Sequence, residues 1–373
     1  MSTNFPNIKQ LNRNRVFRLI AQNDRLAKQD IAAQLSMSLP TVTQNLNELK
    51  SLGLIEENGY FVSGIGRRAR AISLIPTSHV GLGLDLTQNH FALVMVDLKG
   101  NILKSIRKRL HTANTPEYYR TLSQETEEFI RSTQVPRENI LGMGISIPGI
   151  VVKNGTVIEN SNLLKIDHNF YEIYRQYTDL PYILLNDASA SGSAEFYYST
   201  PDSEMVYLFL GNSVGGAVLL NHTMYQGTNC RSGEFGHMTL VPGGLRCHCG
   251  KTGCADAYCS ASVLARYAED NLELFFERLE NGDPYLSSVF ETYLKNLAIL
   301  INNIRVCLDC DIVIGGYVGA YIGKYFGRLK ELVRERLTFA PEDVDFIRPC
   351  TLKLESSAVG GALHYINEFV KKI

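Results

Sequence analysis

The chain has 373 residues, of which 45% are hydrophobic and 20% charged, and its formal net charge is −1. These values exclude a globally disordered chain and allow two or three packed domains. No segment approaches the roughly 20 apolar residues that cross a bilayer, and the first twenty residues have no apolar core of signal-peptide length. We therefore expect a cytoplasmic protein that has no membrane partner.

The charge is unevenly distributed along the chain. Residues 1–75 hold ten lysines and arginines against five acidic residues, so the remainder carries a net charge of −6. A small basic segment attached to a larger acidic body suggests a domain that binds a polyanion. Eight cysteines in a reducing compartment do not predict a disulfide framework.

The basic segment has the pattern of three short helices. Apolar residues recur at helical spacing in residues 7–24 and again in 28–35, with Ile8, Leu11, Val16, Leu19 and Ile20 in the first stretch. A third helix is expected in residues 37–55, where Pro40 suits the first turn and Val42, Leu46 and Leu49 share one face. The other face of this helix has short, uncharged polar residues, which suit hydrogen bonds to base edges.

Residues 53–75 then predict a β-hairpin with a basic tip. The expected head is a winged helix-turn-helix, in which the third helix reads bases and the hairpin contacts phosphates or the minor groove. The residues assigned to DNA are Thr41, Thr43, Gln44, Asn47, Arg67, Arg68 and Arg70. The alternative is a three-helix protein-interaction module whose surface is incidentally basic.

From about residue 79 the pattern changes to apolar strands joined by turns. Residues 79–103 form a strand, loop, strand and turn pattern that returns in residues 205–227. The repeat predicts two similar α/β halves that face one cleft. In actin-like kinases such hairpin turns use glycine to bring backbone N–H groups close to phosphates. Residues 211–216 keep three glycines, whereas 85–90 have none, so we expect the first turn to have lost phosphate binding.

A cluster of one histidine and three cysteines lies in the second half. His237 precedes Cys247 by ten residues, Cys249 follows after one intervening residue, and Cys254 comes five positions later. One imidazole and three thiolates make a closed tetrahedral zinc shell, which leaves no open position for a reactive water. We expect a structural Zn²⁺. The other five cysteines lack such spacing and are better explained as reduced thiols.

The sequence around this cluster resembles the ROK family of repressors, open reading frames and kinases. The motifs are "SGEFGHMTL", "CHCGKTGCADAYCS", "LLNDASASGSAEF", "LFLGNSVGGAVLLN" and "DIVIGGYVG", and the resemblance as a whole extends over most of residues 79–365. The resemblance implies two actin-like (ribonuclease H-like) α/β halves of the sugar kinase type. With a winged helix in front, it implies a sugar-responsive transcriptional regulator that is similar to repressors responsive to xylose, N-acetylglucosamine and glucose.

The resemblance also assigns sugar ligands. Asn186 and Asp187 match the pair whose carboxylate is the general base in kinase members, and Glu234 and His237 match the Glu-x-Gly-His motif. Asp256 stands where the family has Glu, so its carboxylate would reach the sugar from further back. The full sugar-binding set is Gly149, Asn162, Asn186, Asp187, Glu234, His237 and Asp256.

The residues also support this assignment without the resemblance. Asp187 follows an apolar strand and precedes small residues, so it is expected where a strand ends over a cleft. The alternative role for Asp187 is that of a helix N-cap.

The sequence features are compared with three classes of protein: a kinase, a DNA-binding regulator and a protein-binding scaffold. An ATP-dependent ROK kinase would use Asp187 as base, but the Asp-x-Gly-Gly-Thr-type loop of such kinases is "DLTQNH" here. A kinase also has no need of a basic head, and a protein-binding scaffold does not explain the zinc loop together with a polar cleft. We expect a regulator of the repressor type with no enzymatic activity.

The expected partners follow from this class. They are operator DNA, a sugar or sugar phosphate, and a second copy in a homodimer or dimer of dimers. The expected division is 1–75 for the DNA-binding domain, 76–190 for the first half, and 191–373 for the second half, which carries the zinc loop and the dimer contacts.

Overall fold

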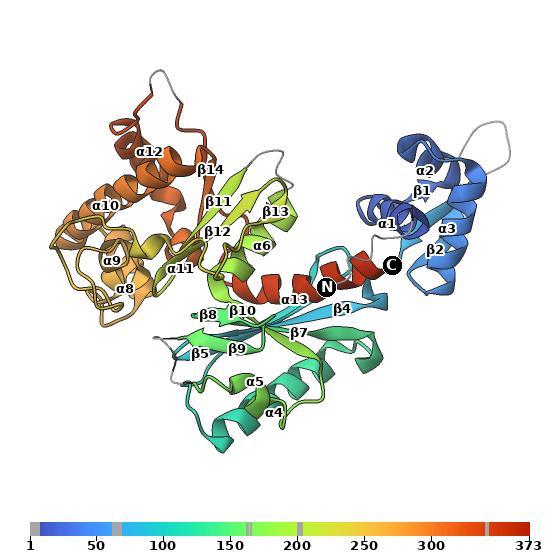
Figure 1. Ribbon diagram of the computed structural model, residues 1–373, viewed down its shortest axis with the longest axis horizontal. Coiled ribbons are helices and arrows are strands. Elements are labelled where there is room, and N and C mark those ends of the chain that lie inside the picture. The colour runs from blue at the N-terminus through green and yellow to red at the C-terminus, as the bar shows by residue number, and fades with distance from the viewer. Residues whose placement is uncertain (1–7, 62–68, 162–163, 165, 200–203, 340–342) are drawn as a thin grey trace.

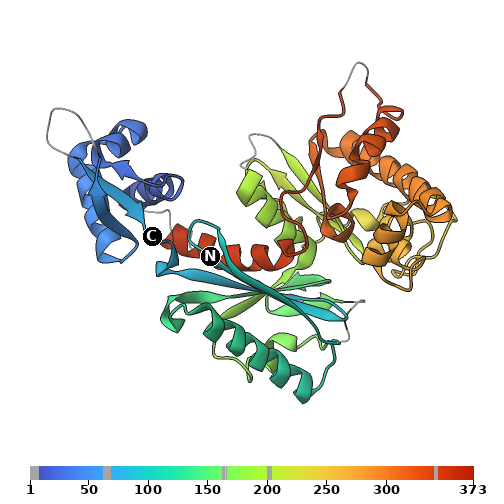
Figure 2. The ribbon, with the colours of Figure 1, turned by 180° about the vertical axis from the view of Figure 1, so that it is seen from behind.

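A computed structural model describes residues 8–61, 69–161, 164, 166–199, 204–339 and 343–373. Figure 1 shows a small N-terminal head beside a larger body, and Figure 2 shows the same arrangement from behind. Within the described ranges, no helix has the length and apolarity needed to span a membrane. The body consists of two α/β halves whose sheets lie on either side of a pair of central helices.

The described part of the head contains three helices and a small sheet. The helices are α1 (Ile8–Ala21), α2 (Lys28–Leu35) and α3 (Leu39–Ser51), and the strands β1 (Leu26–Ala27), β2 (Ile55–Tyr60) and β3 (Arg70–Leu74) pair in the order β1-β3-β2. Ser38 caps α3 by accepting a hydrogen bond from the Thr41 amide, and Pro40 lies in its first turn. The core of α1 begins at Val16 and includes Phe17, whereas Ile8 and Leu11 are exposed. The buried apolar face of α1 is therefore shorter than the apolar pattern in the sequence predicted.

The first half contains a five-stranded sheet in the described part of the chain, in the order β10-β7-β4-β5-β6. Its strands are β4 (Val80–Leu86), β5 (His90–Asp97), β6 (Ile102–Arg109), β7 (Ile140–Ile147) and β10 (Tyr182–Asn186). The helices α4 (Pro116–Thr133) and α5 (Phe170–Tyr174) cover one face of this sheet, and a hairpin of β8 (Ile150–Val152) and β9 (Val157–Asn160) follows β7.

The second half repeats this plan. Its described strands pair in the order β13-β12-β11-β14-β15, with antiparallel pairs β11/β12 and β12/β13 and parallel pairs β11/β14 and β14/β15. They are β11 (Met205–Leu210), β12 (Val214–Leu220), β13 (Thr223–Met224), β14 (Asp311–Gly315) and β15 (Ile347–Pro349). The first sheet has the same alternation, in which β4 corresponds to β11 and β7 to β14. The predicted repeat of two α/β halves is confirmed.

The second half carries most of the helices of the body. They are α7 (Asp256–Cys259), α8 (Ala261–Ala265), α9 (Leu272–Glu280), α10 (Pro284–Leu308), α11 (Gly316–Gly319) and α12 (Phe326–Arg334). The long helix α10 buries an apolar face that includes Leu297, Ile301 and Ile304 against the strands of the second sheet. This packing fixes the sheet that carries the second hairpin turn.

Two helices join the halves: α6 (Asp187–Ser199) and α13 (Ser356–Lys372). A methyl group on Gly83 of β4 would lie 1.7 Å from the Ala358 carbonyl oxygen, and one on Gly361 would lie 2.5 Å from the Gly144 carbonyl oxygen. Glycine therefore lets α13 lie directly on the first sheet. The boundary expected after residue 190 falls inside α6, and α13, expected with the second half, packs on the sheet of the first.

The head contacts the far end of α13 (Figure 2). Gln10 donates to the Lys371 carbonyl at 3.0 Å, and the Arg13 guanidinium donates to the carbonyl of Ile373. Buried residues of the head, such as Phe17 and Leu49, belong to one hydrophobic cluster with Ile366 and Val370 of α13. The head is therefore joined to the body by packing as well as by the chain itself.

Candidate functional site

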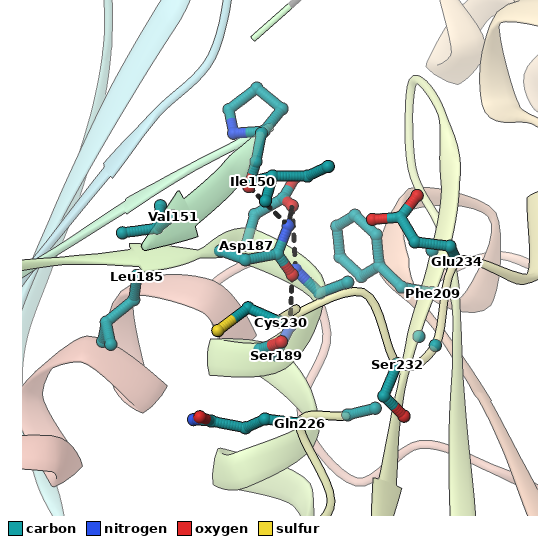
Figure 3. Close-up of a pocket in the computed structure, with 18 of the residues that line it drawn as sticks. Ile150, Val151, Leu185, Asp187, Ser189, Phe209, Gln226, Cys230, Ser232 and Glu234 are labelled. Carbon is teal, nitrogen blue, oxygen red and sulfur yellow. Dashed lines mark hydrogen bonds between the residues drawn. The ribbon is translucent and has the colours of Figure 1, made fainter. Parts of the chain in front are cut away.

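A cavity of about 530 Å³ lies between the two halves. Its walls are the β8/β9 hairpin, the junction of β10 with α6, the start of β12, and residues 224–234. Its polar lining residues include Asn186, Asp187, Ser189, Gln226, Ser232, Glu234, His237, His248 and His364. Figure 3 shows part of this wall, with Asp187 on the α6 side and Glu234 on the segment after β13. A hydrogen-bonding wall of this kind suits a small polar ligand.

Asn186 and Asp187 lie where β10 passes into α6, as the sequence predicted. The Asn186 side chain accepts from the Ser189 amide at 2.8 Å and donates to the Gly149 carbonyl at 3.0 Å. The Asp187 carboxylate accepts from the amide of Ala188 at 2.8 Å and from the side-chain amide of Asn186 at 3.3 Å. Asn186 therefore provides the cap of α6, and the Asp187 carboxylate borders the cavity.

A second carboxyl group, from Asp85 at the end of β4, lies near Asp187. Asp85 is 6% exposed and accepts from the Ser146 hydroxyl at 2.8 Å. Burial raises the pKa of Asp85 to about 6. Burial first, and then the neighbouring Asp85, raise the pKa of Asp187 to about 8. The raised pKa favours the protonated form of Asp187, in which the group both donates and accepts hydrogen bonds.

The turn between β4 and β5 is closed by its own side chains. The Thr87 hydroxyl donates to the His90 carbonyl at 3.0 Å and accepts from the His90 amide at 3.1 Å, while Thr112 donates to the Thr87 carbonyl at 2.7 Å. Asn89 lies 3.0 Å from a ring nitrogen of His111. Much of the polar capacity of this turn is therefore used within the protein.

A contact that the sequence did not predict joins the halves beside this turn. The Arg107 guanidinium of β6 lies 5.7 Å from the centre of the Tyr317 ring of α11. Arg107 also acts on the buried Asp85 carboxyl, whose pKa it lowers against the larger effect of burial. Sequence distance hides this contact because 210 residues separate its partners.

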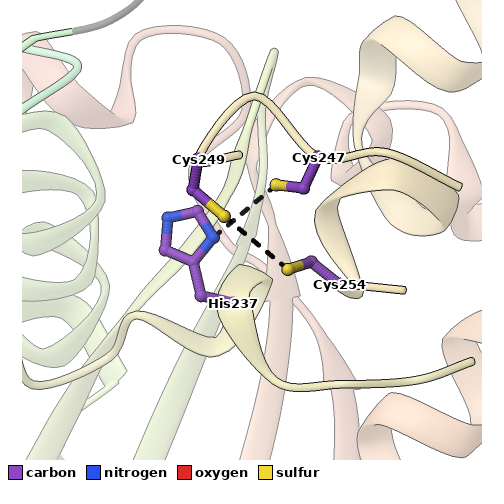
Figure 4. A group of neighbouring side chains, drawn as sticks. All are labelled: His237, Cys247, Cys249 and Cys254. Atoms are coloured by element: carbon purple, nitrogen blue, oxygen red, sulfur yellow. Dashed lines mark hydrogen bonds between the residues drawn. The ribbon is translucent and has the colours of Figure 1, made fainter. Parts of the chain in front are cut away.

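His237, Cys247, Cys249 and Cys254 come together as predicted, and their ligand atoms lie within 4.8 Å of one another (Figure 4). The His237 Nδ1 and Cys247 Sγ atoms are 3.8 Å apart, as are the Sγ atoms of Cys249 and Cys254. Zinc–sulfur bonds of about 2.3 Å at tetrahedral angles place two sulfurs about 3.8 Å apart. The group is therefore compatible with zinc. Gly253 has a φ of +82°, and a methyl group there would lie 1.9 Å from the Val241 carbonyl oxygen.

His237 connects the metal group to the cavity. Its Nδ1 faces Cys247, and its Nε2 lies 3.7 Å from a carboxylate oxygen of Glu234. Both residues border the cavity. The predicted Glu-x-Gly-His pair therefore lies at the junction of the two features.

The other predicted sugar ligands are placed differently. Gly149 borders the cavity, and Asn162 falls outside the residues that the structure describes. Asp256 is 6% exposed and is not among the residues that border the cavity. His248, which does border it, points its Nε2 at the Asp256 carboxylate from 3.3 Å. The sequence offered a signal for His248, since it stands inside the Cys-x-Cys motif.

The predicted DNA-binding residues of α3 lie on its open face. Gln44 and Asn47 are exposed and, with Thr43, border a shallow groove along the helix. Thr43 is held by a hydrogen bond to the Leu39 carbonyl, and Thr41 by one with the Ser38 hydroxyl. Arg70 is paired with Glu57, and Arg67 and Arg68 fall outside the described residues.

A winged helix-turn-helix joined to a two-lobed, sugar-kinase-like body defines the class of DNA-binding transcriptional regulators that carry a small-molecule site. The ROK family model matches residues 81–368, and a model described as winged helix-turn-helix DNA-binding matches residues 11–56. The chain belongs to the ROK family.

Relatives of both kinds are similar to this chain. The xylose repressor of Bacillus spizizenii is 25% identical over 264 residues, covering 69% of this chain and 68% of that protein. A glucokinase of Halalkalibacterium halodurans is 30% identical over 250 residues, which cover 60% of this chain and 76% of that protein. A crystal structure of a ROK family transcriptional regulator, described as a homolog of the E. coli MLC protein, has a TM-score of 0.76 at 22% identity and covers 98% of this chain and 97% of its own. The fold therefore extends to the head.

Proposed function

We propose that the protein is a sugar-responsive repressor that binds operator DNA through α3. We propose that it binds an aldose in the cavity between its halves, and D-xylose is the first candidate. The observation that carries this proposal is the coexistence, in one chain, of an open polar recognition helix and a cavity bordered by Asn186, Asp187 and Glu234. The naming of similar proteins as xylose repressors supports the choice of sugar.

The cavity suits a polyol because its polar groups include both hydrogen-bond donors and hydrogen-bond acceptors. Glu234 accepts hydrogen bonds, and a protonated Asp187 both donates and accepts. Gly149, another predicted ligand on this wall, offers backbone groups. A ring of hydroxyl groups needs such mixed partners, because each hydroxyl is itself donor and acceptor.

We propose that the metal is zinc and that its role is structural. His237, Cys247, Cys249 and Cys254 would fill all four tetrahedral positions and hold the chain between Glu234 and Asp256. A bound zinc would order the wall that presents Glu234 and His248 to the sugar. The ion would supply folding energy to this loop.

The proposed DNA contacts follow from exposure. Gln44 and Asn47 would read base edges, Thr41 and Thr43 would support them, and Arg67, Arg68 and Arg70 would contact the sugar-phosphate backbone. A homodimer would place two α3 helices about 34 Å apart, or a multiple of it, over an inverted repeat. Residues 1–75 would serve as the DNA-binding domain.

The two sites would communicate through α13. At one end of this helix Ser356 and Ser357 hydrogen-bond with Ser191 of α6, the helix that begins with Asp187. At its other end Lys371 and Ile373 contact α1. Closure of the halves on a sugar would therefore move the head. A coupling of about 1–3 kcal/mol would change operator affinity about 5- to 150-fold.

We propose that the cavity binds sugar without phosphorylating it. Asp187 retains the position of a kinase base, which is the observation in favour of the kinase alternative. Against it, the Thr87 hydroxyl and the turn around it are engaged within the protein, so this turn has no glycine-lined cradle for phosphate.

The test uses the full chain and a DNA fragment that the wild-type protein selects from a random pool, called the selected operator below. Thermal shift is measured with D-xylose, D-glucose, N-acetyl-D-glucosamine and the 6-phosphates of the hexoses. One sugar is expected to raise Tm and to change affinity for the selected operator at least fivefold. Failure to select any DNA sequence, or sugar-dependent production of ADP from ATP, would refute the proposal.

A further inference from the structure

Both oxygens of the Asp256 carboxylate have partners inside the protein. Oδ1 accepts from the backbone amide of Val214 at 2.6 Å, and Oδ2 lies 3.3 Å from His248 Nε2. The side chain is 9% exposed. Each oxygen keeps a second acceptor site, but the low exposure of the side chain and its absence from the cavity wall leave it little access to sugar hydroxyls.

His248 stands between Asp256 and the cavity. Its side chain is 31% exposed, and its ring lies 5.3 Å from that of His237. The backbone around it is fixed, because the Cys247 amide donates to the Lys251 carbonyl at 2.8 Å and the Gly250 amide to the Cys247 carbonyl at 3.0 Å. With Nε2 directed at Asp256, Nδ1 is the ring nitrogen left for a ligand.

From this geometry we infer that His248 is a further sugar-contacting residue and that Asp256 is a positioning residue that acts through it. The inference rests on the proposed function, because it assigns a contact within the same cavity. A buried carboxylate that accepts from one nitrogen of a histidine fixes the orientation of the ring, so the other nitrogen meets the ligand in one direction. One ring nitrogen forms a hydrogen bond with one sugar hydroxyl, whereas an exposed carboxylate accepts hydrogen bonds from two neighbouring hydroxyls.

The assignment predicts that His248 and Asp256 are energetically coupled toward the sugar. In a double-mutant cycle, changes at a direct ligand and at a residue acting only through it are not additive. Two independent ligands give additive losses. The cycle therefore separates the positioning role of Asp256 from a direct one.

The experiment measures D-xylose binding to the full chain by calorimetry for the wild type, His248→Ala, Asp256→Asn and the double variant. If thermal shift identifies another sugar of the panel as the ligand, that sugar replaces D-xylose. We expect His248→Ala to lower affinity about tenfold, which corresponds to about 1.4 kcal/mol. Asp256→Asn should lower it about threefold, and the double variant should bind no more weakly than His248→Ala.

Two controls protect this result. His248→Gln keeps a hydrogen-bonding side chain and should retain more affinity than His248→Ala, so a fold defect is distinguished from a lost contact. His222, an exposed histidine of the β12/β13 turn, provides the matched control His222→Ala, which should bind as the wild type does. Zinc content should be equal in all variants.

Three results would overturn the assignment. Wild-type affinity in His248→Ala would remove His248 from the sugar contacts, and an undiminished effect of Asp256→Asn in the His248→Ala background would make Asp256 a direct ligand. A second metal ion per chain, lost in His248→Ala, would assign Cys247, His248 and Asp256 to that ion. If the wild type binds none of the sugars, the proposed function fails, and this assignment fails with it.

Discussion

The head and the body present their functional side chains in opposite ways. On α3, Gln44 and Asn47 are exposed to water on an open helix face. In the body, Asp85 is buried and Asp187 borders the cavity between the halves, and both carboxyls have pKa values raised mainly by burial. The head can therefore respond to long-range charge and to salt, whereas the body selects by shape and by desolvated hydrogen bonds.

The largest expected effect separates the two regions at the sugar site. Asp187→Ala should abolish the sugar's effect on binding to the selected operator, because it removes a proposed ligand from the cavity. Operator affinity without sugar should stay within about twofold, since the operator contacts are on the head. Fluorescence anisotropy with labelled DNA measures both quantities. The exposed Asp270 provides the control Asp270→Ala, and a sugar response that survives in Asp187→Ala would refute the assignment.

Loss of the proposed zinc should act on the body alone. Cys249→Ser is expected to remove zinc and to lower sugar affinity about 10- to 100-fold, because the loop that presents Glu234 and His248 loses its anchor. Elemental analysis and calorimetry measure these two effects. Cys307→Ser, at an exposed cysteine of α10, should change neither. Wild-type protein purified without chelator and found free of zinc would contradict the prediction.

Within the head, two substitutions should have different effects on DNA binding. Gln44→Ala is expected to weaken binding to the selected operator about tenfold and to leave random DNA nearly unaffected, since it removes a base contact. Arg70→Ala should weaken binding to both DNAs and reduce the salt dependence by about one phosphate contact. Titrations at several salt concentrations distinguish the two. An equal loss on both DNAs in Gln44→Ala would show that α3 does not read sequence.

A change in α13 should affect both the head and the body, because this helix contacts both regions. Gly361→Ala places a methyl group against the Gly144 backbone, which overpacks the contact of α13 with the first sheet. We expect Tm to fall by about 5 °C and both operator affinity and the sugar response to decrease. Gly327→Ala on α12 is the control, since a methyl group there meets no atom within 4 Å. A loss confined to one region would show that α13 does not couple them.

The smallest effect expected is on the pH dependence of stability. The pKa of Asp187 is about 8 in the folded chain and ordinarily 3.8, so the folded state holds more protons between these values. The free energy of unfolding should therefore fall as pH rises from about 4 to 8. Asp187→Asn lacks this group, and its Tm should fall less between pH 5 and pH 8, by about 3 °C. Parallel curves for the two proteins would place Asp187 in an ordinary environment.

The sequence predicted best what neighbouring residues determine. The cap and apolar face of α3 and the grouping of His237 with three cysteines depend on spacing over fewer than twenty residues, and the structure has both. The approach of Asp85 to Asp187 and the contact of Arg107 with Tyr317 join residues about 100 and 210 positions apart. Spacing carries no information on such pairs.

Other differences arise from packing that no pattern reveals. Asp256 has the residue type of a sugar ligand, but its carboxylate is engaged by the Val214 amide and by His248. The sequence placed α13 with the half that precedes it, whereas the glycines of β4 and β7 let it pack on the other sheet. Ile8 and Leu11 continue an apolar pattern that the head does not bury.

The repeated order of the two sheets separates what holds each hairpin together from what its turn presents. Strands β4 and β5 are paired from Val80 with Asp97 through Leu86 with Phe91, and the Thr87 hydroxyl adds hydrogen bonds within the turn. The corresponding turn in the second half keeps its glycines. Substitutions at one turn can therefore change the groups that this turn presents, while the paired strands and the apolar interior of both halves stay the same.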